Sequence, residues 1–218
     1  MTILCLGDSH ASFFSGLGTK QNRYMQPVYG EEGKQQNIIP YFKSLRISGD
    51  ATTAYQLMRR INVLEKIVNE NYKEGDILLF CFGEIDCRLH MSKRILLNNE
   101  DVNSIVKECV DRYFKVILYF LDKKIKCAVW GVIGSNPPSL PYPNIYKVGT
   151  MEQRNKITIL FNNLLKQKCD EYNIKFISIF DHMVVNLVTN HECIQDNIHL
   201  SQILMPITIE LFKKENLI

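Results

Sequence analysis

A chain of 218 residues has the length of one domain, and we expect residues 1–218 to form a single domain. Hydrophobic residues make up 46% of the chain and charged residues 22%, which excludes a collagen-like or wholly disordered protein. The formal charge of +3 is too small to indicate a nucleic-acid-binding surface. Because no run of about 18 apolar residues is present, we expect no membrane span. Nothing in the composition predicts the oligomeric state.

Seven cysteines are spread along the chain, most of them within apolar runs or on apolar helical stripes. This placement is typical of small buried thiols rather than of a disulfide framework. No CxxC pair is present, and the spacing of His182, His191, Cys193 and His199 matches no ligand pattern, so we expect no metal and no cofactor. The first residues contain no basic leader or cleavage signal, and we expect a cytoplasmic protein.

Five short apolar runs have the composition of buried β-strands and are closed by Gly, Asp or Ser. They cover residues 3–6, 44–47, 77–82, 127–133 and 175–179. Apolar residues recur with helical spacing over 54–68, 109–120 and 157–169, and a last helix is expected from about Ser201. Asp101 and Thr150 are expected to cap the second and third of these helices. The alternation predicts a three-layer α/β/α fold with a five-stranded parallel sheet.

In such a sheet the ligand lies beyond the carboxyl ends of the strands. Two long segments, 11–43 and 134–149, follow strand ends and are rich in Gly, Pro and aromatic residues. Loops of this length are usually functional or disordered, and the aromatic residues favour ordered walls over the site.

The first predicted strand runs directly into Gly7-Asp8-Ser9-His10. A serine at this place can act as a nucleophile, because backbone N–H groups at a helix start can meet the oxyanion. The alternative is a turn in which Asp8 or Ser9 only caps the helix. Asp196 and His199 precede the last helix, and an Asp three residues ahead of a His can hold its ring in one tautomer. Ser9, His199 and Asp196 could thus form a Ser-His-Asp triad.

With these residues the chain resembles the SGNH, or GDSL-type, hydrolase superfamily. The resemblance rests on GDSH at 7–10, on DNIH at 196–199 and on two blocks between them. Gly49 matches the glycine whose N–H joins the oxyanion hole in that family, and GEID at 83–86 falls where the family has Gly-x-Asn-Asp. The resemblance covers the whole chain and implies a flavodoxin-like sheet and a serine esterase or acyltransferase.

One position departs from the family pattern: Ile85 stands where the family has the oxyanion-hole Asn. Loss of one such donor typically costs about 10²–10³ in rate. Three nearby side chains could replace it, namely Arg88, His90 and Asn136. The block GEIDCRLH resembles a branch of SGNH proteins encoded among bacterial surface-polysaccharide genes.

Other polar residues have two interpretations. Glu84 is either an ion-pair partner of Arg88 or a site residue, and Asp86 either orients Arg88 and holds the loop or belongs to the site. We expect the His10 side chain to point away from Ser9. For Arg154 a surface ion pair is favoured over contact with an anionic substrate.

Three functions remain open. The first is a serine esterase that removes an acyl group from a carbohydrate or a similar small ester. The second is an O-acyltransferase that uses the same triad to modify a surface glycan. The third is a non-catalytic glycan-binding module, which the missing donor at Ile85 suggests. An acylated sugar or glycan is the expected partner in each case.

Overall fold

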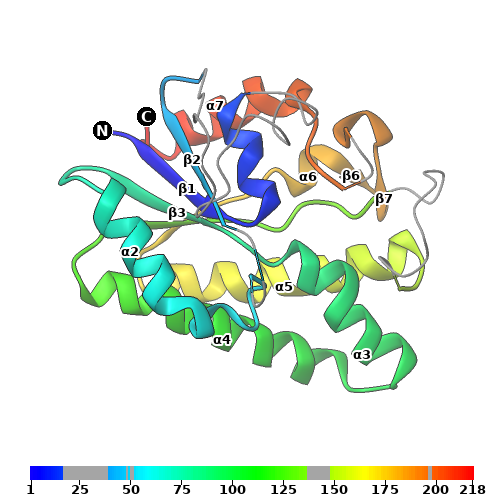
Figure 1. Ribbon diagram of the computed structural model, residues 1–218. Coiled ribbons are helices and arrows are strands. Elements are labelled where there is room, and N and C mark those ends of the chain that lie inside the picture. The colour runs from blue at the N-terminus through cyan, green and yellow to red at the C-terminus, as the bar shows by residue number, and fades with distance from the viewer. Residues whose placement is uncertain (17–38, 48, 50–51, 137–147, 196–197) are drawn as a thin grey trace.

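The computed structural model describes residues 1–16, 39–47, 49, 52–136, 148–195 and 198–218. Most of the two segments expected to form walls, as well as Asp196, lies outside these described residues. Within them, the chain forms a sheet with helices on both faces (Figure 1).

The five strands of the sheet are all parallel and have the order β2-β1-β3-β4-β5. Their bounds are Ile3–Gly7 for β1, Phe42–Arg46 for β2, Ile77–Cys81 for β3, Cys127–Trp130 for β4 and Lys175–Ile177 for β5. This is the flavodoxin-like order, with its switch point between β1 and β3. The predicted five-stranded parallel sheet is confirmed.

The helices pack as one layer on each face, as the two sides of Figure 1 show. The α-helices are α2 (Ile61–Asn71), α3 (Met91–Leu97), α4 (Val102–Asp122), α5 (Met151–Glu171), α6 (Phe180–Met183) and α7 (Met205–Lys214). Side chains of α2, α4 and α5 form one buried cluster with the sheet. The 3₁₀ segment Ser9–Ser15 and α7 form the other, where Phe14 packs on Trp130 and Phe212. Both faces of the sheet are therefore covered, which explains why its strands are apolar throughout.

The ends of the elements differ from the sequence predictions in two instructive places. Strand β4 ends at Trp130 rather than at 133. Gly131 still donates to the Ile177 carbonyl of β5 at 2.8 Å, and beyond it the backbone bonds to side chains of α5. The backbone N–H of Val132 donates to Asn162 Oδ1 at 2.8 Å, and that of Ser135 donates to Asn155 Oδ1 at 2.8 Å. The helical stripe 54–68 is split into a 3₁₀ turn, Leu57–Arg60, and α2.

The expected caps are present. Asp101 accepts a hydrogen bond from the Ser104 N–H at 2.8 Å, and Thr150 forms a reciprocal capping box with Gln153 at the start of α5. Ser201 caps the 3₁₀ turn Gln202–Leu204, which leads directly into α7. A short antiparallel hairpin, β6 (Val184–Val185) and β7 (Val188–Thr189), follows α6. Among the helices in the described residues, none combines the length and the apolar composition that a bilayer crossing needs.

All seven cysteines are buried and free, as the sequence analysis predicted from their apolar surroundings. Burial raises the pKa of the Cys5, Cys81, Cys87 and Cys109 thiols well above the usual value. Since the thiolate is the reactive form, these side chains should react slowly in the folded protein.

We therefore expect dithiothreitol to leave the melting temperature unchanged, and iodoacetamide to label the cysteines only after unfolding. Mass spectrometry of the labelled protein, native and in urea, measures the second effect. A fall in melting temperature on reduction, or rapid labelling of the native protein, would contradict buried free thiols.

Candidate active site

The carboxyl end of β1 can carry the Gly-Asp-Ser turn only because Gly7 has no side chain. A Cβ at position 7 would lie 2.5 Å from the Cys81 carbonyl oxygen and 3.0 Å from Ala11 Cβ. This close approach lets the chain turn at once into the 3₁₀ segment Ser9–Ser15. Asp8 caps that segment, with Oδ1 accepting a hydrogen bond from the His10 N–H at 2.9 Å. Ser9, the first residue of the segment, is half-buried at the edge of the sheet.

Ser9 and His199 meet at this edge. The Ser9 Oγ lies 2.7 Å from His199 Nε2, the distance of a good hydrogen bond. His199 is fixed by a short closed loop: Ile194 and Leu200 form an antiparallel bridge, and the Gln195 N–H donates to the His199 carbonyl at 2.8 Å. Asp196, the predicted partner of this histidine, lies outside the described residues.

A buried charged network lies beside this pair. His10 Nε2 is 3.0 Å from Glu84 Oε2, and the Arg88 Nε–H donates to Glu84 Oε1 at 2.6 Å. The three side chains are almost fully buried. Burial opposes ionisation of Glu84, but Arg88 and His10 outweigh it and hold the pKa of that carboxyl well below its usual range. Glu84 is thus both the ion-pair partner of Arg88 and a neighbour of the site.

The sequence predicts that the His10 side chain points away from Ser9, and this prediction is wrong. Its centroid lies 4.9 Å from that of the His199 ring, and the two planes are tilted by 42°. The physical reason is the 3₁₀ turn, in which successive side chains are about 120° apart. Residues 9 and 10 can therefore both face the strand ends. The sequence offered an ion pair between Glu84 and Arg88. Nothing in it predicted that His10, 74 positions before Glu84, contacts the same carboxylate.

Asp86 holds the loop after β2 against the turn after β3. Its carboxylate accepts hydrogen bonds from the Ala54 N–H at 2.7 Å and the Tyr55 N–H at 3.4 Å. Burial raises the pKa of Asp86 to about 7, although these two donors oppose the shift. Asp86 begins a π-helical turn that ends at His90, which is exposed, while Ile85 before it is half-buried. Gly49, on the loop after β2, is exposed and has a positive φ of 98°.

Arg154 is not a surface residue, and the expected surface ion pair is wrong. Its side chain is only 1% exposed and donates to neutral oxygens: Ser135 Oγ at 2.6 Å, the Gly149 carbonyl at 2.6 Å, and the Asn136 carbonyl at 3.1 Å. It also donates to Asn136 Oδ1 at 3.3 Å. Burial lowers the pKa of Arg154, and the Arg88 charge adds to this.

Two cavities of the described residues have the volume of a small substrate. One, of about 450 Å³, lies between the loop after β2 and the turn after β3. Its lining includes Thr53, Gln56, Asp86, His90 and Met91. Asp86 follows Glu84 by two residues, so this cavity and the buried charged network share the turn after β3.

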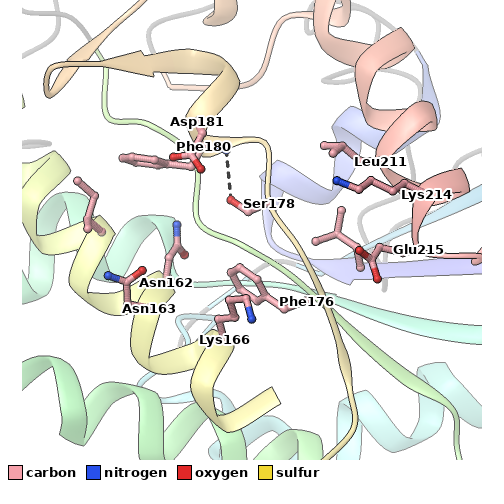
Figure 2. A pocket seen from close by; sticks show the side chains of 12 residues that line it. Asn162, Asn163, Lys166, Phe176, Ser178, Phe180, Asp181, Leu211, Lys214 and Glu215 are labelled. Atoms are coloured by element: carbon pink, nitrogen blue, oxygen red, sulfur yellow. Dashed lines mark hydrogen bonds between the residues drawn. The ribbon is translucent and has the colours of Figure 1, made fainter. Parts of the chain in front are cut away.

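The other cavity, of about 300 Å³, lies at the opposite edge of the sheet, between α5 and α7 (Figure 2). Figure 2 shows Phe176 of β5 at its base and Asn162, Asn163 and Lys166 along α5. Strand β5 is three strands from β1, a separation of about 14 Å at the usual spacing.

In the described residues, no three His, Cys, Asp or Glu side chains gather in a way that could hold a metal ion.

No protein-family model and no curated protein matches the sequence. Solved structures do match. A GDSL-like lipase from Bacteroides thetaiotaomicron is similar with a TM-score of 0.57 and 15% identity, over 98% of this chain and 86% of the lipase. The acetyl xylan esterase AlAXEase is similar with a TM-score of 0.53 and 14% identity, over 99% of both chains.

A protein from Bacteroides fragilis, assigned as an acylhydrolase, is similar with a TM-score of 0.59 and 11% identity, over 98% of this chain and 85% of that one. The predicted SGNH, or GDSL-type, resemblance is therefore confirmed at the level of the fold. The chain has the α/β fold of these hydrolases.

Gly7→Ala tests the close packing under the turn. We expect the added Cβ to push β1 and β3 apart and to lower the free energy of unfolding by about 1–3 kcal/mol. Gly75→Ala is the control, since a Cβ there meets nothing within 4 Å and carries only the strain of a positive φ. Urea unfolding measures both. Equal stability of Gly7→Ala and the wild type would contradict the close approach.

Proposed function

We propose that the protein is a serine esterase that removes an acyl group from a carbohydrate or similar small ester. The observation that carries this proposal is the 2.7 Å contact between Ser9 Oγ and His199 Nε2 at the carboxyl edge of the sheet. A hydroxyl at this distance from a neutral imidazole is the arrangement of an activated nucleophile. The shared fold with GDSL-type esterases and lipases supports the same conclusion.

In the proposed reaction, Ser9 Oγ attacks the acyl carbonyl while His199 Nε2 takes its proton. His199 then gives this proton to the leaving alcohol, and an acyl-serine remains. Water attacks the acyl-serine with His199 again as base, and Ser9 is restored. Asp196 is the group we assign to orient His199, as the resemblance implies. The oxyanion would accept hydrogen bonds from the backbone N–H groups of Ser9 and Gly49.

Asn136 is the side chain that we assign to replace the donor missing at Ile85. Asn136 is 3% exposed, and Arg154 fixes its amide by donating to Oδ1 at 3.3 Å. Of the two other candidates, Arg88 is bonded to Glu84, and His90 lines the 450 Å³ cavity from an exposed position. Asn136 is therefore buried and held in one orientation after β4, whereas Arg88 is engaged by Glu84 and His90 is exposed.

For the alcohol part of the substrate we propose a sugar. The 450 Å³ cavity has a mixed lining, with Thr53, Gln56 and His90 as polar groups over Met91, which suits a ring with hydroxyl groups and an apolar face. The similar acetyl xylan esterase and the block GEIDCRLH point to the same class of substrate. A cytoplasmic location accords with seven free thiols. Transfer of the acyl group to a glycan hydroxyl uses the same residues and is the second candidate, since only the acceptor differs.

Ser9→Ala and His199→Ala should each lower the turnover of p-nitrophenyl acetate by about a thousandfold or more, because the pair acts as a unit. The melting temperature of both variants should stay close to that of the wild type. A fluorophosphonate probe should label the wild type at Ser9 and should not label Ser9→Ala. Near-wild-type turnover by either variant would contradict the roles assigned to Ser9 and His199. A wild type that the probe does not label would favour a non-catalytic module.

Product analysis separates the two catalytic candidates. An O-acetylated sugar is incubated with and without a second, unacylated glycan as acceptor. An esterase releases acetate at the same rate in both cases, whereas an acyltransferase acylates the added glycan.

Asn136→Ala should lower kcat by about a hundredfold and change KM little, because the amide would act on charge that develops in the transition state. Asn163→Ala, an exposed asparagine in the other cavity, is the matched control. With Asn136 in this role, Ile85→Asn should not raise kcat. A tenfold rise with Ile85→Asn, together with unchanged kcat in Asn136→Ala, would show that the assignment is wrong.

A further inference from the structure

His10 has a position that the proposed reaction leaves unexplained. It directly follows Ser9, its ring centroid is 4.9 Å from that of His199, and its Nε2 is 3.0 Å from a Glu84 oxygen. The His10 side chain is 8% exposed, so water screens it little from its neighbours. A carboxylate that is itself held by Arg88 at 2.6 Å cannot turn away from this histidine.

We propose that His10 is a positioning residue: its protonated ring, anchored on Glu84, lies against His199 and disfavours a second positive charge there, so that His199 stays a neutral base down to mildly acidic pH. The inference rests on the proposed function, since it takes His199 as the base. It assigns to the Glu84–Arg88 pair the task of holding a positive charge beside the reacting groups.

The groups around His10 favour its charged form. Glu84 faces it from the turn after β3 and Asp8 from its own segment, and both are acidic. Arg88 behind Glu84 opposes them, while Cys81 at the end of β3 has a thiol whose pKa is raised by burial and is therefore neutral. Trp130 at the end of β4, with Val132 and Ile133 after it, lines the same small cavity as His10.

Burial by itself disfavours the charged ring, but Glu84 and Asp8 outweigh it and raise the pKa of His10. Burial also raises the pKa of Asp8 itself, while the His10 charge opposes that shift. His10 Nδ1 has no hydrogen-bond partner within the described residues.

A positive charge close to an imidazole has two opposite effects on catalysis. It increases the fraction of neutral His199 at acidic pH, because like charges disfavour the second protonation. It also makes His199 a weaker base, which slows proton transfer where the ring is already neutral. Loss of the His10 charge should therefore lower the rate at acidic pH and leave it equal or higher at alkaline pH. A merely structural role would lower the rate at every pH.

The test is the pH profile of kcat/KM for p-nitrophenyl acetate. His10→Gln keeps an N–H donor close to the place of Nε2 without the charge, and His10→Phe keeps a ring without either. In both we expect the midpoint of the acidic limb to rise by about half to one unit, and the variant and wild-type profiles to cross. His182→Gln, which changes an exposed histidine on α6, is the control and should leave the profile unchanged.

Proton NMR of the histidine rings gives a second readout that requires no turnover. In Ser9→Ala, the His10 ring should remain protonated at pH 7, and adding His10→Gln should raise the titration midpoint of His199. The titrations test the charge of His10, whereas ester turnover tests Ser9 as the nucleophile. Either result can be negative while the other is positive, so the role of His10 and the proposed esterase function are tested separately. A neutral His10 at pH 7, or unshifted midpoints in both His10 variants, would overturn the inference.

Discussion

The hydrogen bond between Ser9 and His199 joins two residues that are 190 positions apart in the sequence. It can form only if the first strand and the segment before the last helix end at the same edge. The parallel sheet supplies this condition, because its strands all present their carboxyl ends on one side. Everything else in the site adjusts a contact that the topology makes possible. Gly7 allows the chain to turn directly after β1, so that Ser9 lies at the strand end, and the bridge between Ile194 and Leu200 fixes His199.

Several charged side chains are buried around this contact, and a buried charge is tolerated only when it has bonding partners. Glu84 is bonded to Arg88 and His10, Asp86 to two backbone N–H groups, and Arg154 to a hydroxyl and two backbone carbonyls. Removing one partner of such a pair usually destabilises more than the pair itself stabilises. The strand ends are thereby made rigid, and a rigid frame holds a nucleophile and a base at bonding distance more precisely than a loop would.

How far the sequence predicts this molecule depends on the kind of interaction. The apolar runs predicted the five strands and their parallel arrangement, because strands that are buried on both faces consist of consecutive apolar residues. Asp101 and Thr150 were predicted as caps for the same local reason, and both are confirmed. The sequence also singled out Ser9 and His199 by their places at strand and helix ends.

What the sequence could not predict depends on contacts between distant elements. The orientation of His10 follows from a 3₁₀ turn whose geometry has no compositional signature, and its partner Glu84 comes from another strand end. Arg154 has the appearance of a surface residue in the sequence, since charged residues at helix starts are usually solvated. Its burial results from acceptors on either side of a long insertion, which no local pattern reveals.

This buried guanidinium has a consequence for how the protein can change. Arg154 bonds to Asn136 and to the Gly149 carbonyl, which flank the segment 137–147. One side chain on a helix therefore clamps the two ends of an eleven-residue insertion, independently of what lies between them. Because the entropy of closing a loop grows only slowly with its length, residues could be added to or removed from this insertion at little cost in folding free energy. Asn136 and Gly149 would keep their places beside α5 in such variants, because the same guanidinium holds both.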